Sequence, residues 1–377
     1  MPWRSSWVVP RGWRADRSRG ATTVRFCGDG RVRGRRRLSH LPVVALLALA
    51  TISCQPSTDT PIGMTVHVRD AEVLAEKFDL MAEMGVTWVR MDIDWSVVER
   101  TQGSPDWSYP DMVVDEADAR GMQVLFVLAF TPPWARTAAV DDATIAHHQR
   151  PQQLSQWAYF ARAAATRYAP RGVHSWEIWN EPNTAKFWPP QPDANEYGTL
   201  FWVAADAIRD VDPQATLLIG GLGPQFETPG REIEPGEYLE QLYANGAAYR
   251  ADAVAAHPYS FPALPMQTPQ RMTGGFADLP ALRSVMEHHG EGDKSIWITE
   301  YGAPTGTGPN AVSDDTQTQM LLQARRQVAD WSWAGPLIYY ELADGGTDPA
   351  DPEQNFGVVR RDLTPKPAAV ALMDGAT

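Results

Sequence analysis

The stretch Ser175–Asn183 reads SWEIWNEPN, and a second stretch about 120 residues later, Ser295–Pro304, reads SIWITEYGAP. Each begins as a short apolar run and then places a glutamate, Glu181 or Glu300, beside residues that favour loops. Apolar runs of this length are typical of strands that are buried on both faces of a parallel sheet. The two stretches therefore predict two buried strands, each of which ends in a carboxylate.

Six further runs of the same kind predict strands at 62–68, 88–95, 124–130, 216–222, 253–259 and 336–342. Amphipathic stretches between the runs predict helices, among them 71–85, 152–169, 196–211, 314–330 and 366–373. Eight strand–helix units in about 310 residues match a (β/α)8 TIM barrel, a single α/β domain. An open doubly wound sheet is the alternative, but it normally shows a glycine-rich turn after its first strand, whereas this chain has HVRD at that point.

The chain divides into three expected parts: a basic prefix with a secretory or lipoprotein signal at 1–53, a tether at 54–61 and the barrel domain at 62–377. The prefix contains three consecutive arginines at 35–37 and then an apolar run over 41–50, and Cys54 follows directly after the prefix. This order is typical of a secretory signal, and the apolar run is shorter than the roughly 20 residues that span a bilayer. The segment before Cys54 resembles the lipobox of bacterial lipoproteins, which implies lipidation of Cys54 and a membrane anchor. Ordinary secretion is the alternative, and either predicts an exported protein at the cell surface or outside the cell.

Charge and cysteine content limit the partners and the bonds of the mature chain. The whole chain carries a net charge of −13, and the first 53 residues contribute +9, so the remainder carries −22. A body this acidic repels phosphates, which argues against a nucleic-acid partner. Cys27 lies in the prefix, so a mature chain keeps only Cys54 and has no intramolecular disulfide. The oligomeric state stays open.

Polar and aromatic residues gather at the carboxyl ends of the predicted strands, where TIM barrels have their active sites. They are His67, Arg90, Asp92, Asp94, Trp95, Trp134, Asn180, Glu181, His257, Tyr259, Glu300, Tyr301, Tyr340 and Asp344. Sugars require this mixture, because they carry hydroxyl groups at the edge and apolar C–H faces, and glycosidic bond cleavage requires two carboxyl groups. Strands four and seven of a barrel place their Cα atoms roughly 13 Å apart, so the carboxyl groups of Glu181 and Glu300 should lie about 5–6 Å apart. That estimate favours a retaining mechanism, which uses about 5–5.5 Å, over an inverting one, which uses about 6.5–9.5 Å.

The pair WNEPN and WITEYG resembles clan A of the glycoside hydrolases, the retaining (β/α)8 enzymes. The resemblance runs from Ile62 to Leu372 and is greatest to family 39, with the cellulase-like family 5 second. It implies that Glu181 is the acid/base, that Glu300 is the nucleophile and that Asn180 binds the sugar 2-hydroxyl. It also assigns to substrate binding the arginine of strand two and the histidine and tyrosine of strand six, which are Arg90, His257 and Tyr259. Many clan members have a tryptophan in strand eight, and here Tyr339 or Tyr340 must replace it.

Several other residues have expected roles. His67 is a candidate substrate-binding residue, and Trp134 and Trp188 are expected to stack on sugar rings from loops. The tryptophans on helical stretches and in strand seven are expected in the core: Trp157, Trp202, Trp297, Trp331 and Trp333. The histidine pairs at 147–148 and 288–289 are expected to be solvated, because neighbouring histidines cannot share a face and no third ligand is suitably spaced. No metal site and no cofactor are expected.

The sequence thus predicts a retaining β-glycosidase that cleaves O-glycosidic bonds of oligo- or polysaccharides by double displacement. The alternative is a catalytically inactive, carbohydrate-binding lipoprotein on the same barrel, and transglycosylation would use the same residues. The sugar, the linkage and the exo or endo mode of action stay open. They depend on the loops at 131–151, 183–195, 223–236 and 259–276, of which 262–276 could form a cleft wall or a lid.

Overall fold

The computed structural model describes residues 60–67, 73–136, 145–226, 231–267 and 272–376. The predicted signal and Cys54 lie outside these residues, as do parts of three of the loops expected to form the subsites.

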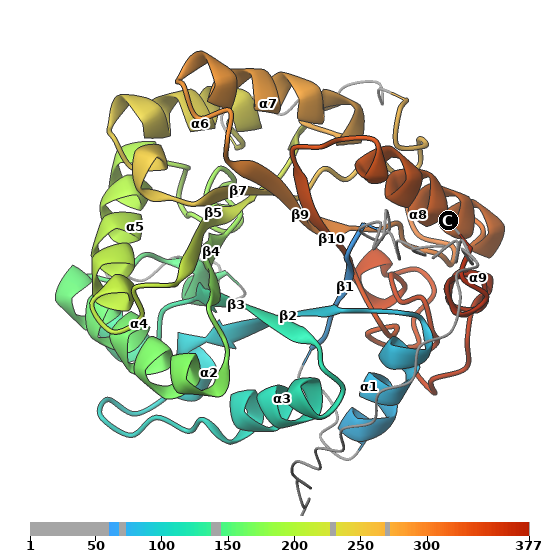
Figure 1. Ribbon diagram of the computed structural model, residues 1–377, viewed down its shortest axis with the longest axis horizontal. Helices are drawn as coiled ribbons and strands as arrows, with labels where there is room; N and C mark the ends of the chain where they lie inside the picture. Colours follow the sequence, from blue (N-terminus) through green and yellow to red (C-terminus); the bar gives the residue numbers. More distant parts are fainter. Residues whose placement is uncertain (1–59, 68–72, 137–144, 227–230, 268–271, 377) are drawn as a thin grey trace, which may run out of the picture. The chain divides into compact units, whose positions relative to one another are not determined.

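Eight parallel strands close into a barrel, seen end-on in Figure 1. They are β1 (Ile62–Thr65), β2 (Trp88–Asp94), β3 (Gln123–Ala129), β4 (Ser175–Asn180), β5 (Thr216–Leu222), β7 (Ala253–Ala256), β9 (Ser295–Tyr301) and β10 (Ala334–Tyr339). The barrel closes where β1 pairs in parallel with β10, with Gly63 opposite Ile338. Each strand coincides with a predicted apolar run to within a few residues, and the TIM-barrel prediction is confirmed.

Helices surround the barrel on its outside (Figure 1). They are α1 (Leu74–Glu83), α2 (Trp95–Val98), α3 (Ser108–Ala119), α4 (Leu154–Tyr168), α5 (Ala194–Arg209), α6 (Pro235–Ala244), α7 (Leu279–His288), α8 (Asp314–Ala329) and α9 (Pro367–Met373). Side-chain caps define several of their starts: the Asp193 carboxylate accepts the amides that begin α5, and Ser313 Oγ accepts the Thr316 amide at the start of α8. No helix within the described residues combines the length and apolar character needed to cross a membrane.

The barrel interior has its own small core at the amino-terminal ends of the strands. It is formed by Leu125, Leu218, Ala253, Ala255, Trp297 and Ile338, with Trp88 packed against them. The rings of Trp88 and Trp297 meet edge to face at 5.0 Å, and Gly63 leaves room for them, since a β-carbon there would lie 2.9 Å from that of Trp88. These side chains fill this part of the barrel and leave its carboxyl-terminal end for a ligand. The structural role predicted for Trp297 is confirmed.

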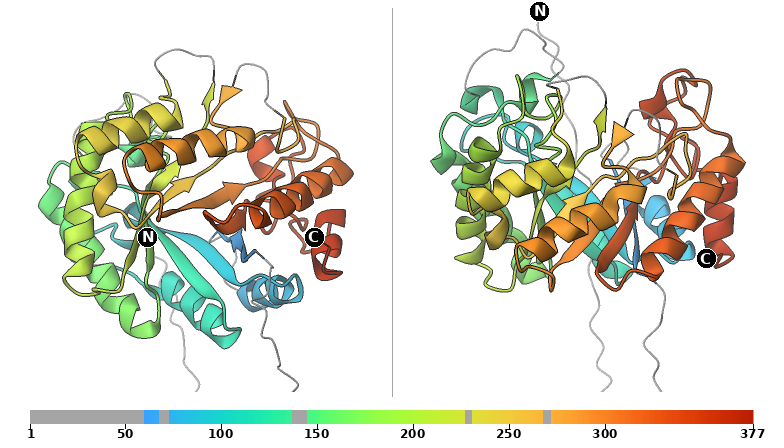
Figure 2. Two further views of the ribbon diagram at one scale, coloured as in Figure 1. Left: turned by 45° about the horizontal axis from the view of Figure 1, so that its top comes forward. Right: turned by 90° about the horizontal axis from the view of Figure 1, so that it is seen from above.

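Two of the long loops are joined by a small sheet that the sequence did not predict. In it β6 (Gln225–Phe226) pairs antiparallel with β8 (Met272–Thr273), so the loops that follow β5 and β7 are tied together. Figure 2 shows this sheet projecting beyond one end of the barrel. Within the segment 262–276, Met272–Thr273 is therefore hydrogen-bonded to the loop that follows β5. Short 3-10 helices occur at 133–135, 146–148, 169–171, 248–250, 276–278 and 352–354.

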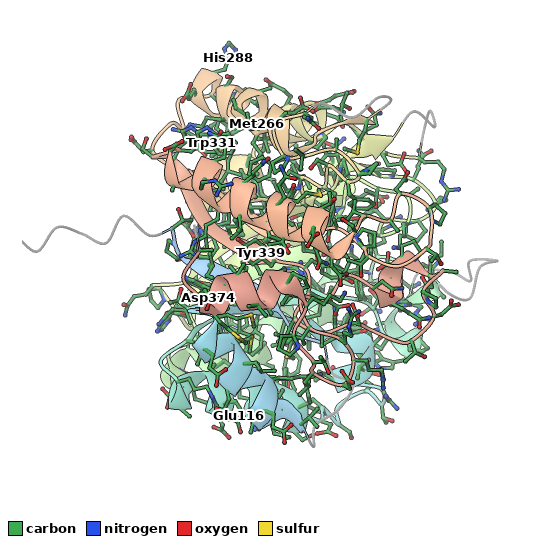
Figure 3. All side chains as sticks on the ribbon, turned by 90° about the vertical axis from the view of Figure 1, so that its right-hand side faces the viewer. Glu116, Met266, His288, Trp331, Tyr339 and Asp374 are labelled. Atoms are coloured by element: carbon green, nitrogen blue, oxygen red, sulfur yellow. The ribbon has the colours of Figure 1, made fainter. Side chains whose placement is uncertain are left out.

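The tryptophans expected on helices differ in burial. Trp157 is fully buried, as predicted. Trp202 is 40% exposed on α5, where the Arg250 guanidinium lies over its ring, so its assignment to the core was wrong. Trp331 and Trp333 follow the end of α8 and are half-buried, with their rings stacked on each other at 4.7 Å (Trp331 is labelled in Figure 3).

Candidate active site

A cavity of about 540 Å³ lies at the carboxyl-terminal end of the barrel. Its walls come from the ends of most of the strands and from the loops that follow them. The lining residues are His67, Asp92, Phe130, His148, Asn180, Glu181, Thr184, Lys186, Phe187, Pro224, Glu232, Tyr259, Phe261, Glu300, Tyr340, Glu353 and Phe356. Both glutamates that were singled out in the sequence face this one space.

The carboxyl groups of Glu181 and Glu300 approach each other closely. One carboxylate oxygen of each and one ring nitrogen of His257 all lie within 4.8 Å of one another. The side chain of Glu300 is 9% exposed, and that of Glu181 is 15% exposed. The two acids are therefore near enough for one sugar ring to contact both.

Arg90 links Glu300 to a buried glutamate that the sequence reasoning did not single out, Glu177. The Arg90 guanidinium donates to Glu300 Oε1 at 2.6 Å and, through Nε and Nη2, to both oxygens of Glu177 at 3.1 Å. Burial favours neutral Glu177, but the Arg90 charge and the nearby His257 outweigh burial and lower the pKa of Glu177 to about 2. A glutamate in the middle of an apolar strand requires a cation, so Glu177 could have been paired with Arg90 from sequence.

The charge of Glu300 is stabilised from two sides. Burial alone would raise its pKa, but the positive charges of His257 and Arg90 and the Tyr259 hydroxyl, which donates at 2.6 Å, hold the pKa of Glu300 below its usual value. Arg90 also donates to Asn180 Oδ1 at 2.9 Å. Because a guanidinium can only donate, the amide group of Asn180 is left to face the cavity with its Nδ2.

His257 lies between the two acids. Its Nδ1 is 3.0 Å from Glu181 Oε1 and 3.5 Å from Glu300 Oε2. Burial opposes a charge on the ring, but Glu300 and contacts with Glu177 and Glu181 raise the pKa of His257 to about 9. His257 is therefore an imidazolium at neutral pH, and Nδ1–H donates to Glu181.

Glycines at the end of β5 make room for this cluster. A β-carbon at Gly221 would overlap the His257 ring, and one at Gly223 would lie 2.9 Å from the carboxyl carbon of Glu181. Glu181 itself has a backbone φ of 44°, in the left-handed region that non-glycine residues rarely adopt. The strand end is thus shaped around the carboxyl groups rather than for regular pairing.

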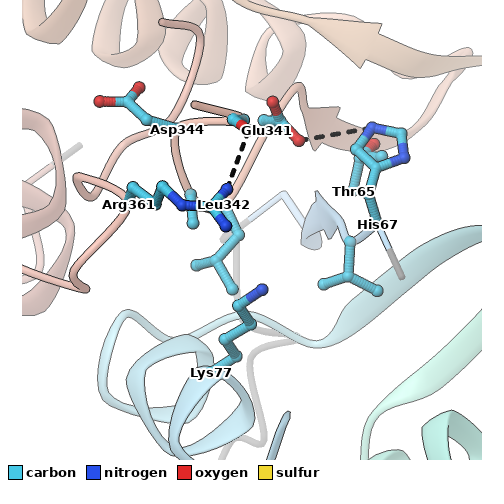
Figure 4. Close-up of a pocket in the computed structure, with 10 residues that line it drawn as sticks. Thr65, His67, Lys77, Glu341, Leu342, Asp344 and Arg361 are labelled. Atoms are coloured by element: carbon cyan, nitrogen blue, oxygen red, sulfur yellow. Dashed lines mark hydrogen bonds and ion pairs between the residues drawn. The ribbon is translucent and has the colours of Figure 1, made fainter. Parts of the chain in front are cut away.

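His67 and Tyr340 form the wall beside β1 and β10. Figure 4 shows the ion pair in which His67 Nε2 lies 3.4 Å from Glu341, beside a small neighbouring cavity. The Tyr340 ring meets those of His67, Tyr259 and Phe356 edge to face. Of the two tyrosines left open by the sequence, Tyr340 lines the cavity, whereas Tyr339 is buried.

The aromatic residues that line the cavity are not the two tryptophans chosen from the sequence. Trp188 is 1% exposed and packs against Trp179 and Tyr197, so its predicted stacking on sugar was wrong. Trp134 packs edge to face on Trp95, donates to a backbone carbonyl at 2.9 Å and is half-buried outside the lining of this cavity, so its predicted stacking on sugar stays a prediction. The aromatic lining instead consists of His67, Phe130, His148, Phe187, Tyr259, Phe261, Tyr340 and Phe356.

The two histidine pairs predicted to be solvated differ in burial. His288 is exposed on α7, as predicted. His148 is 6% exposed between the rings of Phe130 and Phe187, so its prediction as a solvated residue was wrong. Burial lowers its pKa to about 3, and its Nδ1 donates to the Lys186 carbonyl at 2.6 Å. His148 is thus a neutral part of the cavity wall.

A metal ion would have to compete with this ion-pair network. Within the described residues, Glu181, His257 and Glu300 come close enough together to chelate an ion. A protonated imidazole cannot act as a ligand, however, and the raised pKa of His257 favours that form. The donor set therefore fits a proton-transfer site better than a metal centre.

Comparisons with known proteins relate this site to glycoside hydrolases. Residues 55–335 match the model of the family described as cellulase, glycosyl hydrolase family 5. A β-xylosidase of Geobacillus stearothermophilus is 25% identical over 285 residues, which are 70% of this chain and 54% of that protein. The chain thus spans about half the length of that relative.

Solved structures share the fold. A family 39 glycoside hydrolase from Bacteroides cellulosilyticus WH2 superposes with a TM-score of 0.67 at 24% identity, over 85% of this chain and 64% of that one. A monomeric β-xylosidase from Caulobacter crescentus CB15 superposes with a TM-score of 0.61 at 20% identity, over 84% and 67% of the two chains. The predicted similarity to clan A, and within it to families 39 and 5, is confirmed.

Proposed function

The chain belongs to the cellulase family, glycosyl hydrolase family 5, and from that premise we propose that it is a retaining β-glycosidase with Glu300 as nucleophile and Glu181 as acid/base. The separation of the two carboxyl groups carries the proposal. Oxygens within 4.8 Å of each other suit the short spacing of retaining enzymes and leave no room for the water that an inverting enzyme places between its carboxyl groups. An inactive carbohydrate-binding protein has no support, since both carboxyl groups are in place.

In the first step Glu300 attacks the anomeric carbon while the bond to the leaving oxygen breaks. Arg90 and Tyr259 each donate to Glu300 and keep it ionised for this attack. Glu181 gives a proton to the leaving oxygen, while the proton on His257 Nδ1 passes to Glu181 Oε1 and leaves His257 neutral until the second step returns it.

In the second step a water molecule attacks the same carbon, and the bond to Glu300 breaks. Glu181 now accepts the proton of that water, so it acts as the base. The free Asn180 amide can hold a sugar hydroxyl in both steps, and the aromatic walls can pack on the C–H faces of sugar rings.

The stereochemistry of azide products tests the two roles separately. With an activated aryl β-glycoside and azide, Glu300→Ala should give the α-glycosyl azide, because azide enters the space of the missing nucleophile. Glu181→Ala should give the β-glycosyl azide, because azide attacks the glycosyl-enzyme. An active Glu300→Ala variant without azide, or β-azide from that variant, would refute the assignment.

Export and lipidation of Cys54 remain proposals based on the prefix alone. Mass spectrometry of the protein from a membrane fraction of its host would test them, since lipidation predicts a diacylglyceryl adduct on an amino-terminal Cys54.

A further inference from the structure

Asp92 is a half-buried carboxylate at the cavity that the mechanism above does not use. It lies on β2 two residues after Arg90, so both side chains point to the inside of the barrel. It lines the cavity together with Glu300. Its Oδ1 is buried and makes no hydrogen bond to any residue that the structure describes.

A buried polar atom without a hydrogen bond destabilises the folded protein and needs an explanation. A carboxylate oxygen that is buried without a partner loses its hydration, and native proteins rarely keep one. Each neighbouring acid has a partner: Glu177 and Glu300 bind Arg90, and Glu181 binds His257. Burial raises the pKa of Asp92 to about 6 despite the nearby Arg90, so most of it is still ionised at neutral pH.

The position of Asp92 indicates which part of a substrate it would meet. Its charge interacts with those of Arg90, Glu300 and Glu177, which are the groups around the nucleophile. Asp92 lines the same cavity as Glu300, so a sugar attached to Glu300 can contact it. A carboxylate accepts hydrogen bonds only, and a sugar offers hydroxyl donors.

We propose that Asp92 is a further substrate-binding residue, whose carboxylate accepts hydrogen bonds from hydroxyl groups of the sugar that Glu300 attacks. This inference rests on the proposed function and adds a substrate class to it. The cavity is lined by five acids, Asp92, Glu181, Glu232, Glu300 and Glu353, and its lysine, Lys186, is paired with Glu353 at 3.8 Å. Asp92 therefore selects neutral sugars, such as glucosides or xylosides, against glucuronides, whose carboxylate it would repel.

The test combines one variant with substrates that lack one hydroxyl. The wild type is first given aryl β-glucoside, β-xyloside and β-glucuronide, and the best neutral substrate is then replaced by its 3-deoxy and 4-deoxy analogues. Asp92→Asn is the test variant. Asp115→Asn is the matched control, because it makes the same change on the outer helix α3, where the Asp115 side chain is 76% exposed.

Asp92→Asn should lower kcat/KM on the neutral glycoside about 10- to 100-fold, the range for a hydrogen bond to a charged group. At least one deoxy analogue should lose about tenfold in the wild type and less than about threefold in Asp92→Asn. The variant should also discriminate less against the glucuronide and should melt no lower than the wild type. Asp115→Asn should behave like the wild type in kcat/KM.

Three results would overturn the inference. The first is a kcat/KM of Asp92→Asn within about threefold of the wild type on every substrate. The second is a loss of kcat/KM on the deoxy analogues that is the same in the variant as in the wild type. The third is an Asp92→Asn protein that melts at a lower temperature or fails to fold, which would show a structural role. If the wild type labels Glu300 with a 2-fluoro glycoside and one of these results is found, this inference alone fails. If no glycoside is hydrolysed and no label forms, the proposed function fails and this inference with it.

Discussion

Replacing Glu177 by Gln removes the charge that balances Arg90 and His257 while it keeps the shape of the side chain. Glu177 is fully buried and accepts two hydrogen bonds from Arg90 and one from the Gly221 amide at 2.8 Å. In the variant, Arg90 loses a charged acceptor. The NH2 group of the Gln side chain must also face an N–H donor of Arg90 or of the Gly221 backbone, where Glu177 had an acceptor oxygen. We expect a stable fold with a lower free energy of unfolding.

The magnitude follows from the pKa of Glu177. A folded-state pKa of about 2 against an unfolded value of 4.5 means that the charged form stabilises the folded protein by about 3 kcal/mol at pH 7. Because the folded-state pKa is depressed, this stabilisation is complete above pH 4.5 and is lost as the pH falls towards 2. At pH 3 it is reduced to about 1 kcal/mol.

Urea unfolding of wild type and Glu177→Gln at pH 7 and pH 3 measures both values. The matched control is Glu116→Gln on the outer surface (Figure 3), where the ion pair with Arg120 is partly exposed and worth less than about 1 kcal/mol. The same difference between wild type and Glu177→Gln at the two pH values, or a difference at pH 7 no larger than that of the control, would refute the reasoning.

Three further variants test neighbouring features. Tyr259→Phe removes a hydrogen bond that favours ionised Glu300, so the pKa of Glu300 should rise and the acid limb of kcat/KM should move to higher pH; an unmoved limb would contradict this. Asp92→Asn should be more stable than the wild type by about 1–3 kcal/mol at pH 7 and no more stable at pH 4. The reason is that the raised pKa of Asp92 makes its charged form destabilising only as the pH rises through about 4 to 6. Urea unfolding at both pH values checks this. Trp188→Ala should cost about 3–5 kcal/mol of stability, whereas Trp202→Ala on the surface should cost less than about 1 kcal/mol; equal losses in thermal unfolding would contradict the assignment of Trp188 to the core.

The barrel could be predicted from sequence because its strands are local features. Each is a short apolar run that needs no knowledge of its partner, and runs such as 216–222 were located to the residue. The β6–β8 pair could not be predicted in the same way. Its strands have two residues each, and their pairing depends on two loops that meet only after the barrel has formed.

The carboxyl groups of the site were predictable for a related reason. Glu181 and Glu300 end their strands, so the barrel geometry alone brings them together. Glu177 was overlooked, and Asp92 was named at its strand end without a role, because their roles depend on their partners. Glu177 binds a buried arginine, and Asp92 has no hydrogen bond within the described residues. Loop side chains were the least predictable, since Trp188 and His148 could each face the cavity or the core, and packing against distant rings decides between them.

Trapping of the glycosyl-enzyme tests the central claim most directly. The protein is incubated with a 2-fluoro β-glycoside that carries an activated leaving group, digested, and its peptides are sequenced by mass spectrometry. The account predicts one sugar per chain, bound to Glu300, and no label in Glu300→Ala. Hydrolysis that proceeds without any label, or a label on Glu181 or another residue, would contradict it.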